Sequence, residues 1–130
     1  MYKFSKKSLE KINHPKFSPV LKELLERAIE TSPIDFTVIE TVRTIEKQRE
    51  YVKRGTSKTM KSRHIAENNK SGLCEAVDIA PYPIEWGNVE RFKELAEHIN
   101  KTAQKLRVVL RWGGDWKTFK DYPHWEIKNR

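Results

Sequence analysis

Near its C-terminal end the chain reads Val108-Val109-Leu110-Arg111-Trp112-Gly113-Gly114-Asp115-Trp116-Lys117-Thr118-Phe119-Lys120-Asp121-Tyr122-Pro123-His124-Trp125-Glu126-Ile127. The apolar triplet 108–110 and the segment 124–127 predict two short strands, and the Gly113-Gly114 pair predicts a turn between them. The second strand begins with a histidine that follows Asp121 by three residues. A carboxylate and an imidazole at this spacing suggest metal-assisted chemistry.

The preceding sequence predicts both helices and strands, without regular alternation. Apolar residues recur at helical spacing in three segments, 19–31, 45–54 and 89–106, which Ser18-Pro19, Gly55 and Asn88 delimit. β-branched and apolar residues predict strands at 36–42 and 76–80. We therefore expect an α+β fold in which a small, mostly antiparallel sheet packs against helices, as one domain over residues 1–130.

Composition limits the possible environments and partners. The 130 residues carry a net charge of +8, which favours an anionic partner such as nucleic acid or a cell envelope. Six of the basic residues lie between 53 and 70 against the single acid Glu67, in a segment that predicts a long loop at 56–75. Since no basic helix with interleaved aromatic residues is present, we expect no nucleic acid partner.

The sequence also indicates where the protein is made. No stretch approaches the length of apolar sequence that crosses a bilayer, and the basic N-terminus lacks an apolar export segment, so we expect no signal peptide. The single cysteine, Cys74, excludes an internal disulfide and suits a cytoplasm. Nothing in the sequence indicates more than a monomer.

Three residues are candidate metal ligands: His64, Asp78 and His124. Asp78 alternates with Val77 and Ile79 on a predicted strand, so its side chain faces away from theirs. His124, on another predicted strand, is able to meet Asp78 across the sheet. Two imidazoles and one carboxylate leave a fourth position on Zn²⁺ open for water. Taken singly, each residue has an ordinary surface or core interpretation, and only their combination favours a catalytic site.

These motifs resemble a known family. Ser62-Arg63-His64, then Ala76-Val77-Asp78, then Asp121-Tyr122-Pro123-His124 followed by an acid are similar to the zinc peptidases of the D-alanyl-D-alanine carboxypeptidase type. The run from Arg111 to His124 most resembles the L-alanyl-D-glutamate endopeptidases of phage endolysins and bacterial wall hydrolases. The resemblance extends over about residues 36–127. It implies a zinc-dependent hydrolase that cleaves peptidoglycan stem peptides, is made in the host cytoplasm, and acts on the cell wall during phage release.

The resemblance also implies a role for each matching residue. His64, Asp78 and His124 would hold the zinc ion, and Asp121 would be the general base. Arg43, which Gln48 follows by five residues, would stabilise the developing oxyanion. Ser62 would hydrogen-bond substrate or orient the loop. Of the dense aromatic group 112–125, we expect part to form core and one or two rings to line a groove.

One spacing departs from the family. Thirteen residues separate His64 from Asp78, where the family has about six. The additional residues predict a surface excursion at about 66–73, and Cys74 follows it. Cys74 has two interpretations, a small packed side chain, which we favour, and a further zinc ligand.

Three other functions remain open. A D-alanyl-D-alanine carboxypeptidase or dipeptidase would use the same chemistry on another bond. A non-catalytic zinc-containing module that binds the envelope would need neither Asp121 nor Arg43. A small nucleic-acid-binding protein is suggested by charge alone.

Overall fold

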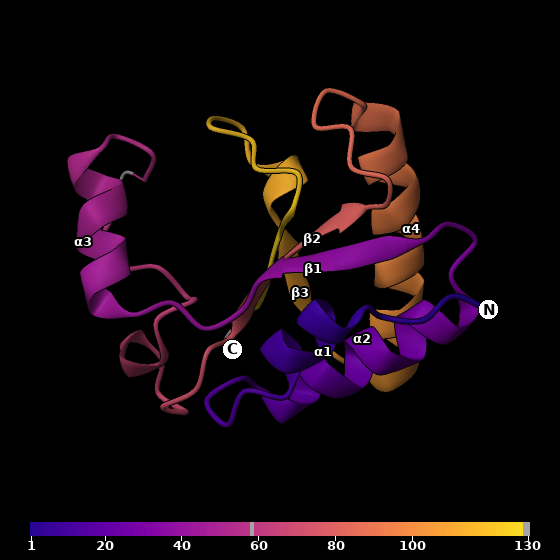
Figure 1. The fold of residues 1–130 in the computed structure, drawn as a ribbon, viewed down its shortest axis with the longest axis horizontal. Helices are drawn as coiled ribbons and strands as arrows, with labels where there is room; N and C mark the ends of the chain where they lie inside the picture. The colour runs from indigo at the N-terminus through magenta and orange to yellow at the C-terminus, as the bar shows by residue number, and fades with distance from the viewer. Residues whose placement is uncertain (58, 129–130) are drawn as a thin grey trace.

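Within residues 1–57 and 59–128, which the computed structural model describes, four short strands form one antiparallel sheet in the order β1-β2-β4-β3 (Figure 1). The strands are β1 (Phe36–Glu40), β2 (Ala76–Pro81), β3 (Leu110–Trp112) and β4 (His124–Ile127). This confirms the predicted α+β class with a small antiparallel sheet. Lys58, one of the basic residues of the predicted loop, lies outside the described residues.

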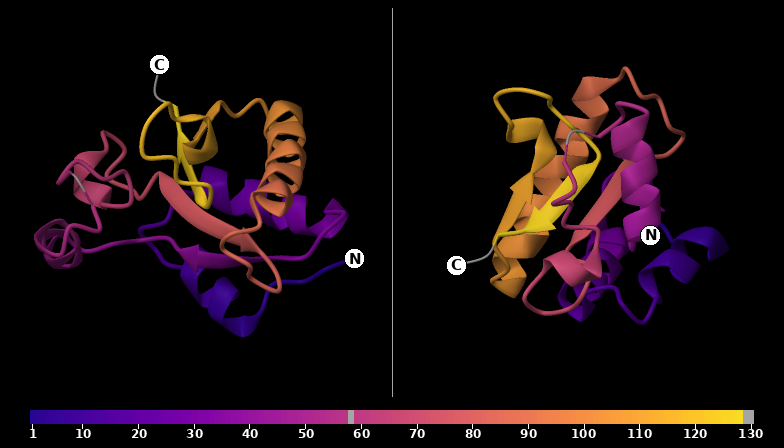
Figure 2. Two further views of the ribbon diagram at one scale, coloured as in Figure 1. Left: turned by 90° about the horizontal axis from the view of Figure 1, so that it is seen from above. Right: turned by 90° about the vertical axis from the view of Figure 1, so that its left-hand side faces the viewer.

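Helices cover the sheet unequally. They are α1 (Lys6–Ile12), α2 (Pro19–Thr31), α3 (Ile45–Lys53) and α4 (Val89–Leu106), with short 3₁₀ turns η1 (Ala66–Asn68) and η2 (Gly113–Asp115). Helices α2 and α4 pack on each other, α4 also contacts β2 and β3, and α1 contacts β1. Helix α3 lies apart from this layer, beyond the end of β1 (Figures 1 and 2). None of the described helices is both long and apolar enough to span a membrane.

The two faces of the sheet carry different side chains. Val77 and Ile79 of β2 and Trp125 of β4 are buried in the core against α2 and α4. Burying each such side chain contributes about 1.5–3 kcal/mol. Because successive strand residues point to opposite faces, Asp78 and His124 project from the other side of the sheet, where they are register partners. The core thus holds β2 and β4 in the register that brings these two polar residues together.

A bulge in β1 adds a third polar residue to this face. The pairing with β2 shifts between Val38 and Glu40, so Val38 opposes Ile79 while Glu40 opposes Asp78. A β-bulge redirects the side chains that follow it. Glu40 therefore lies on the same face of the sheet as Asp78 and not in the core.

Several predicted boundaries are confirmed. Ser18 caps α2, Asn88 caps α4, and Gly55 follows α3 with a φ of +78°, the left-handed conformation that suits glycine after a helix. The strand predicted at 108–110 is wrong by two residues, because Val108 donates its N–H to Ala103 in the turn that ends α4, and pairing with β4 begins at Leu110.

The structure differs from expectation at the N-terminus. Helix α1 was not predicted, since it is a basic helix of about two turns with few apolar residues. Ser8 of this helix is buried, and its hydroxyl accepts the N–H of Val38 at 3.0 Å. An exposed edge strand presents unpaired backbone groups. Helix α1 thus covers the free edge of β1.

Candidate metal centre and active site

Three side chains from distant parts of the chain converge beside the polar face of the sheet. His64 comes from the loop after α3, Asp78 from β2 and His124 from β4. One donor atom of each lies within 4.8 Å of the other two. The Nε2 atom of His64 and the Nδ1 atom of His124 are 3.3 and 3.2 Å from the same Asp78 oxygen. The structure therefore brings together the three predicted ligands, despite the longer spacing between His64 and Asp78.

The second nitrogen of each imidazole has its own partner. His64 Nδ1 donates to the carbonyl oxygen of Thr41 at 2.6 Å, which leaves Nε2 free to face Asp78. His124 Nε2 lies 2.8 Å from Glu126, which leaves Nδ1 on the Asp78 side. Such outer contacts fix the ring orientation and tautomer of metal-binding histidines. Two oriented imidazole nitrogens and one carboxylate oxygen suit Zn²⁺, so the donor set fits this ion.

The charges in this cluster stabilise one another. Burial alone would raise the pKa of Asp78, but hydrogen bonds from His124 and His64 outweigh it and hold that pKa well below its usual range. Burial would lower the pKa of His124, yet its hydrogen bonds to Asp78 and Glu126 raise it to about 9. Without a metal, the imidazole of His124 is therefore protonated at neutral pH, and a metal ion must displace this proton.

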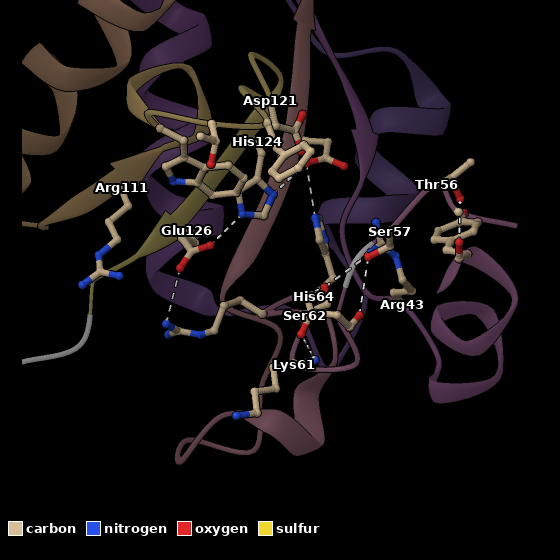
Figure 3. A pocket seen from close by; sticks show the side chains of 18 of the residues that line it. Arg43, Thr56, Ser57, Lys61, Ser62, His64, Arg111, Asp121, His124 and Glu126 are labelled. Carbon is tan, nitrogen blue, oxygen red and sulfur yellow. Dashed lines mark hydrogen bonds and ion pairs between the residues drawn. The ribbon is translucent and has the colours of Figure 1, made fainter. Parts of the chain in front are cut away.

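Asp121 lies next to His124 in the loop that precedes β4 (Figure 3). Its backbone N–H donates to Gly113 at 3.0 Å, and its carbonyl accepts the N–H of His124 at 3.1 Å. Burial, together with the negative charge of Asp78, raises the pKa of the Asp121 carboxyl. A carboxylate with a raised pKa is better matched to accepting and returning a proton near neutral pH.

Arg43 is held by contacts on several sides. Its Nε donates to Glu40 at 2.7 Å, and its Nη1 donates to Gln48 at 2.7 Å. The guanidinium also lies 4.7 Å from the ring centre of Tyr51, within the range of a cation–π contact. The bulge that redirects Glu40 thus supplies the carboxylate that fixes Arg43. Ser62 connects Arg43 to the loop that carries His64. Its hydroxyl accepts from Arg43 Nη1 at 3.4 Å and from the backbone N–H of His64 at 3.2 Å.

The converging residues line one open pocket of about 1050 Å³. Arg43, Ser62 and Asp121 lie on its wall with the three candidate ligands. Of the aromatic group, Trp116 and Phe119 line the pocket, whereas Trp112 and Trp125 are buried in the core. As expected, some rings of this group form core and two others line the pocket.

Glu126 has a role that sequence reasoning did not assign. Besides contacting His124, it lies 3.6 Å from Arg63, which also pairs with Glu75 and donates to Asn69 at 2.5 Å. Its signal in the sequence is the spacing of two from His124 on a strand, which places both side chains on one face. Thr41 was also missed, and no side-chain pattern could have found it because its backbone carbonyl makes the contact.

The structure also bears on the two interpretations of Cys74. Cys74 is fully buried, and its thiol lies 3.2 Å from the carbonyl oxygen of Thr41 and 3.1 Å from that of Ala76, so its one proton has an acceptor on either side. Burial raises the pKa of this thiol to about 12. Cys74 does not join His64, Asp78 and His124 in the metal-binding group found among the described residues, which supports the packed interpretation.

His98 of α4 is half-buried and joins two helices. Its Nε2 lies 2.9 Å from the carbonyl oxygen of Ala28 and 3.3 Å from the hydroxyl of Thr31, so it ties α4 to the C-terminal end of α2. Helix C-terminal carbonyls have no partner within the helix, and an imidazole N–H supplies one here.

One pocket holds two imidazoles, a carboxylate, an adjacent acid and a fixed arginine, and such a set is able to support metal-assisted peptide hydrolysis. A family model for the phage L-alanyl-D-glutamate peptidases matches residues 1–130. The chain belongs to this family.

Individual relatives agree with the family model. The chain is 34% identical to the L-alanyl-D-glutamate peptidase of Escherichia phage T5, over 98% of this chain and 90% of the phage protein. It is 32% identical to the peptidoglycan L-alanyl-D-glutamate endopeptidase CwlK of Bacillus subtilis, over 84% of this chain and 72% of that protein. The crystal structure of the L-Ala D-Glu endopeptidase ChiX of Serratia marcescens superposes with a TM-score of 0.81 at 30% identity, covering 96% and 89% of the two chains.

Proposed function

We propose that this protein is a zinc-dependent endolysin that hydrolyses the bond between L-alanine and D-glutamate in the stem peptides of peptidoglycan. The observation that carries the proposal is the convergence of His64, Asp78 and His124 beside Asp121 in one pocket, in a member of this peptidase family. Holding a metal requires only the first three residues. The presence of Asp121 and of a fixed Arg43 favours turnover over a purely structural metal site.

In this proposal His64, Asp78 and His124 hold the zinc ion through Nε2, a carboxylate oxygen and Nδ1. When bound, the ion supplies Lewis-acid chemistry, polarising the scissile carbonyl and making a water molecule more acidic. Asp121 takes the proton from the attacking water and returns it to the amine of the departing D-glutamate residue. The partly buried position that raises the pKa of Asp121 suits both transfers.

Arg43 stabilises the negative charge that develops on the carbonyl oxygen. Its contacts with Glu40, Gln48 and Tyr51 fix the guanidinium before substrate binds, so little reorganisation is needed during the reaction. Ser62 connects Arg43 to the loop of His64 and is placed on the pocket wall, where its hydroxyl is able to contact substrate.

The proposal extends to the setting of the reaction. We place residues 1–130 in one peptidase domain that acts as a monomer, is made in the host cytoplasm and reaches the cell wall during phage release. The net charge of +8 would speed its approach to an anionic envelope. The rate of lysis should then fall as ionic strength rises, and a rate independent of salt would contradict this part of the proposal.

The test is mass spectrometry of purified peptidoglycan digested with zinc-loaded protein, beside a chelated control. We expect new amino termini on D-glutamate with zinc and none with chelator. Asp121→Asn should lower the rate by about 10²–10⁴-fold while zinc stoichiometry is retained, because only the general base is lost. Asp115→Asn, which alters an exposed acid of the same segment, is the matched control and should remain active. Release of terminal D-alanine, or an active Asp121→Asn variant, would contradict the proposal.

A further inference from the structure

Five basic side chains line the pocket, and most of them already have partners. Arg43 pairs with Glu40, Arg54 with Glu50, and Arg63 with Glu75. Lys61 and Arg111 also line the pocket, and among residues 1–57 and 59–128 neither side chain forms a salt bridge or hydrogen bond. A cation left unpaired in a substrate pocket is available to an anion of the substrate.

Arg111 is the better placed of the two, because a strand fixes its position relative to the metal centre. It lies on β3 and is the register partner of Glu126 on β4, so the two side chains share the face that carries His124. Strand geometry puts its Cα roughly 8 Å from that of His124, one strand over and two residues along. Lys61 lies in the loop between α3 and β2, without such a constraint.

Figure 3 shows Arg111 on the opposite side of the centre from Arg43, with Glu126 between Arg111 and His124. Glu126 accepts from His124 at 2.8 Å and faces Arg63 at 3.6 Å, while the charge of Arg111, which forms no salt bridge with it, helps to lower the pKa of its carboxyl. The guanidinium of Arg111 remains exposed on the pocket wall. The two arginines thus flank the centre, one held by hydrogen bonds to Glu40 and the other without a hydrogen bond or salt bridge among the described residues.

The substrate of the proposed function, on which this inference rests, carries a matching anion. The amino group of its D-glutamate residue lies in the scissile bond, and one of its two carboxyl groups continues the peptide. The other carboxyl group remains as a free carboxylate, on the leaving-group side and close to the bond that is cut. A guanidinium binds a carboxylate through two parallel hydrogen bonds, which gives directional selectivity.

We propose that Arg111 is a specificity-determining residue that binds the free carboxylate of the D-glutamate residue. With Arg43 on one side of the centre and Arg111 on the other, the carboxylate fixes which way the peptide lies across the ligands. Arg111 recognises the free carboxylate next to the scissile bond and takes no part in proton transfer.

The test uses two synthetic stem peptides that differ only in this carboxyl group, which is free in one and a carboxamide in the other. For the wild-type protein we expect kcat/KM to be up to about fivefold higher on the free acid, since an ion pair at an exposed site gives an effect of this size. Arg111→Gln should lose this preference, because its kcat/KM should fall on the free acid and not on the carboxamide. Arg111→Lys should keep part of it. Arg27→Gln, which removes an exposed arginine of α2 with the same change in net charge, is the control and should behave like the wild type.

A second readout does not depend on turnover. Binding of the product peptide that begins with D-glutamate to the metal-free protein, followed by NMR chemical shifts, should weaken by up to about fivefold in Arg111→Gln and not in Arg27→Gln. Equal loss on both substrates in Arg111→Gln, or equal wild-type rates on the two peptides, would overturn the role of Arg111 while leaving the proposed function intact. Cleavage of neither peptide by the zinc-loaded wild type would instead overturn the proposed function, and this inference with it.

Discussion

Replacing Gly113 by alanine tests how the structure positions the proposed base. A Cβ atom at Gly113 would lie 2.1 Å from the carbonyl oxygen of Asp121 and 3.0 Å from its Cβ, whereas ordinary contacts begin at 3.4 Å. The nearest atom belongs to the backbone and has no rotamer to change. Asp121 would therefore have to move by about 1.3 Å or more, and its 3.0 Å hydrogen bond to the Gly113 carbonyl would be distorted.

The expected cost has two parts. Overpacking of this kind destabilises a protein by about 1–3 kcal/mol, which for a chain of this size lowers Tm by roughly 4–12 °C. A displacement of about 1 Å in a catalytic group lowers the rate by roughly 100-fold. Gly87→Ala is the matched control, because a Cβ there meets no atom within 4 Å. That change should leave activity intact and alter stability by less than about 1 kcal/mol, in the stabilising direction.

Both variants are compared by urea unfolding and by hydrolysis of a stem peptide, with zinc content measured in parallel. Gly113→Ala should lose stability and rate but still bind zinc, since His64, Asp78 and His124 are not themselves replaced. If Gly113→Ala matched Gly87→Ala in both stability and rate, the close approach between Gly113 and Asp121 would be wrong.

Four further predictions follow from the contacts and pKa shifts at or near the site. Because the pKa of His124 is raised to about 9, zinc binding at pH 7 should release a proton, and zinc affinity should rise about tenfold per pH unit until pH 9. Calorimetry in two buffers of different ionisation enthalpy measures the proton release, and zinc binding without it would contradict this prediction. In the metal-free protein the same shift adds stability that is fully present below about pH 6.5 and is lost as pH rises through 9, so its Tm should fall over that window. Glu126→Gln should weaken zinc binding by about 10–100-fold in a chelator competition, because the ring of His124 loses its charged partner; unchanged affinity would remove Glu126 from the metal centre. Cys74, buried and with a pKa of about 12, should resist a thiol reagent at pH 8 until the protein is unfolded, and fast labelling of the native protein would contradict its burial.

The parts of the fold that the sequence predicts are those with a local signal. Helix α4 has a regular apolar stripe and the cap Asn88, and β2 has the alternation of Val77, Asp78 and Ile79. Helix α1 lacks such a stripe. Its position depends on the contact between Ser8 and the backbone of Val38, 30 residues away, which no local pattern encodes.

At the candidate site, too, the sequence shows some features and not others. Ligand-type side chains are recognisable from residue type and motif, and the structure brings His64, Asp78 and His124 together as expected. The contacts that orient them are less visible, since one is the Thr41 carbonyl and another depends on the bulge that turns Glu40 toward Arg43. A bulge and a backbone carbonyl carry no residue-type signal, so only the folded chain reveals them.

The proposed function depends on one zinc ion held by His64, Asp78 and His124. A crystal structure of the zinc-loaded protein, with anomalous scattering recorded on both sides of the zinc absorption edge, would locate this ion. We expect one strong anomalous peak bonded to His64 Nε2, an Asp78 oxygen and His124 Nδ1, with Glu126 still contacting the other nitrogen of His124. A peak elsewhere on the protein, or one bonded to His124 Nε2 and Glu126 in place of Nδ1 and Asp78, would contradict it.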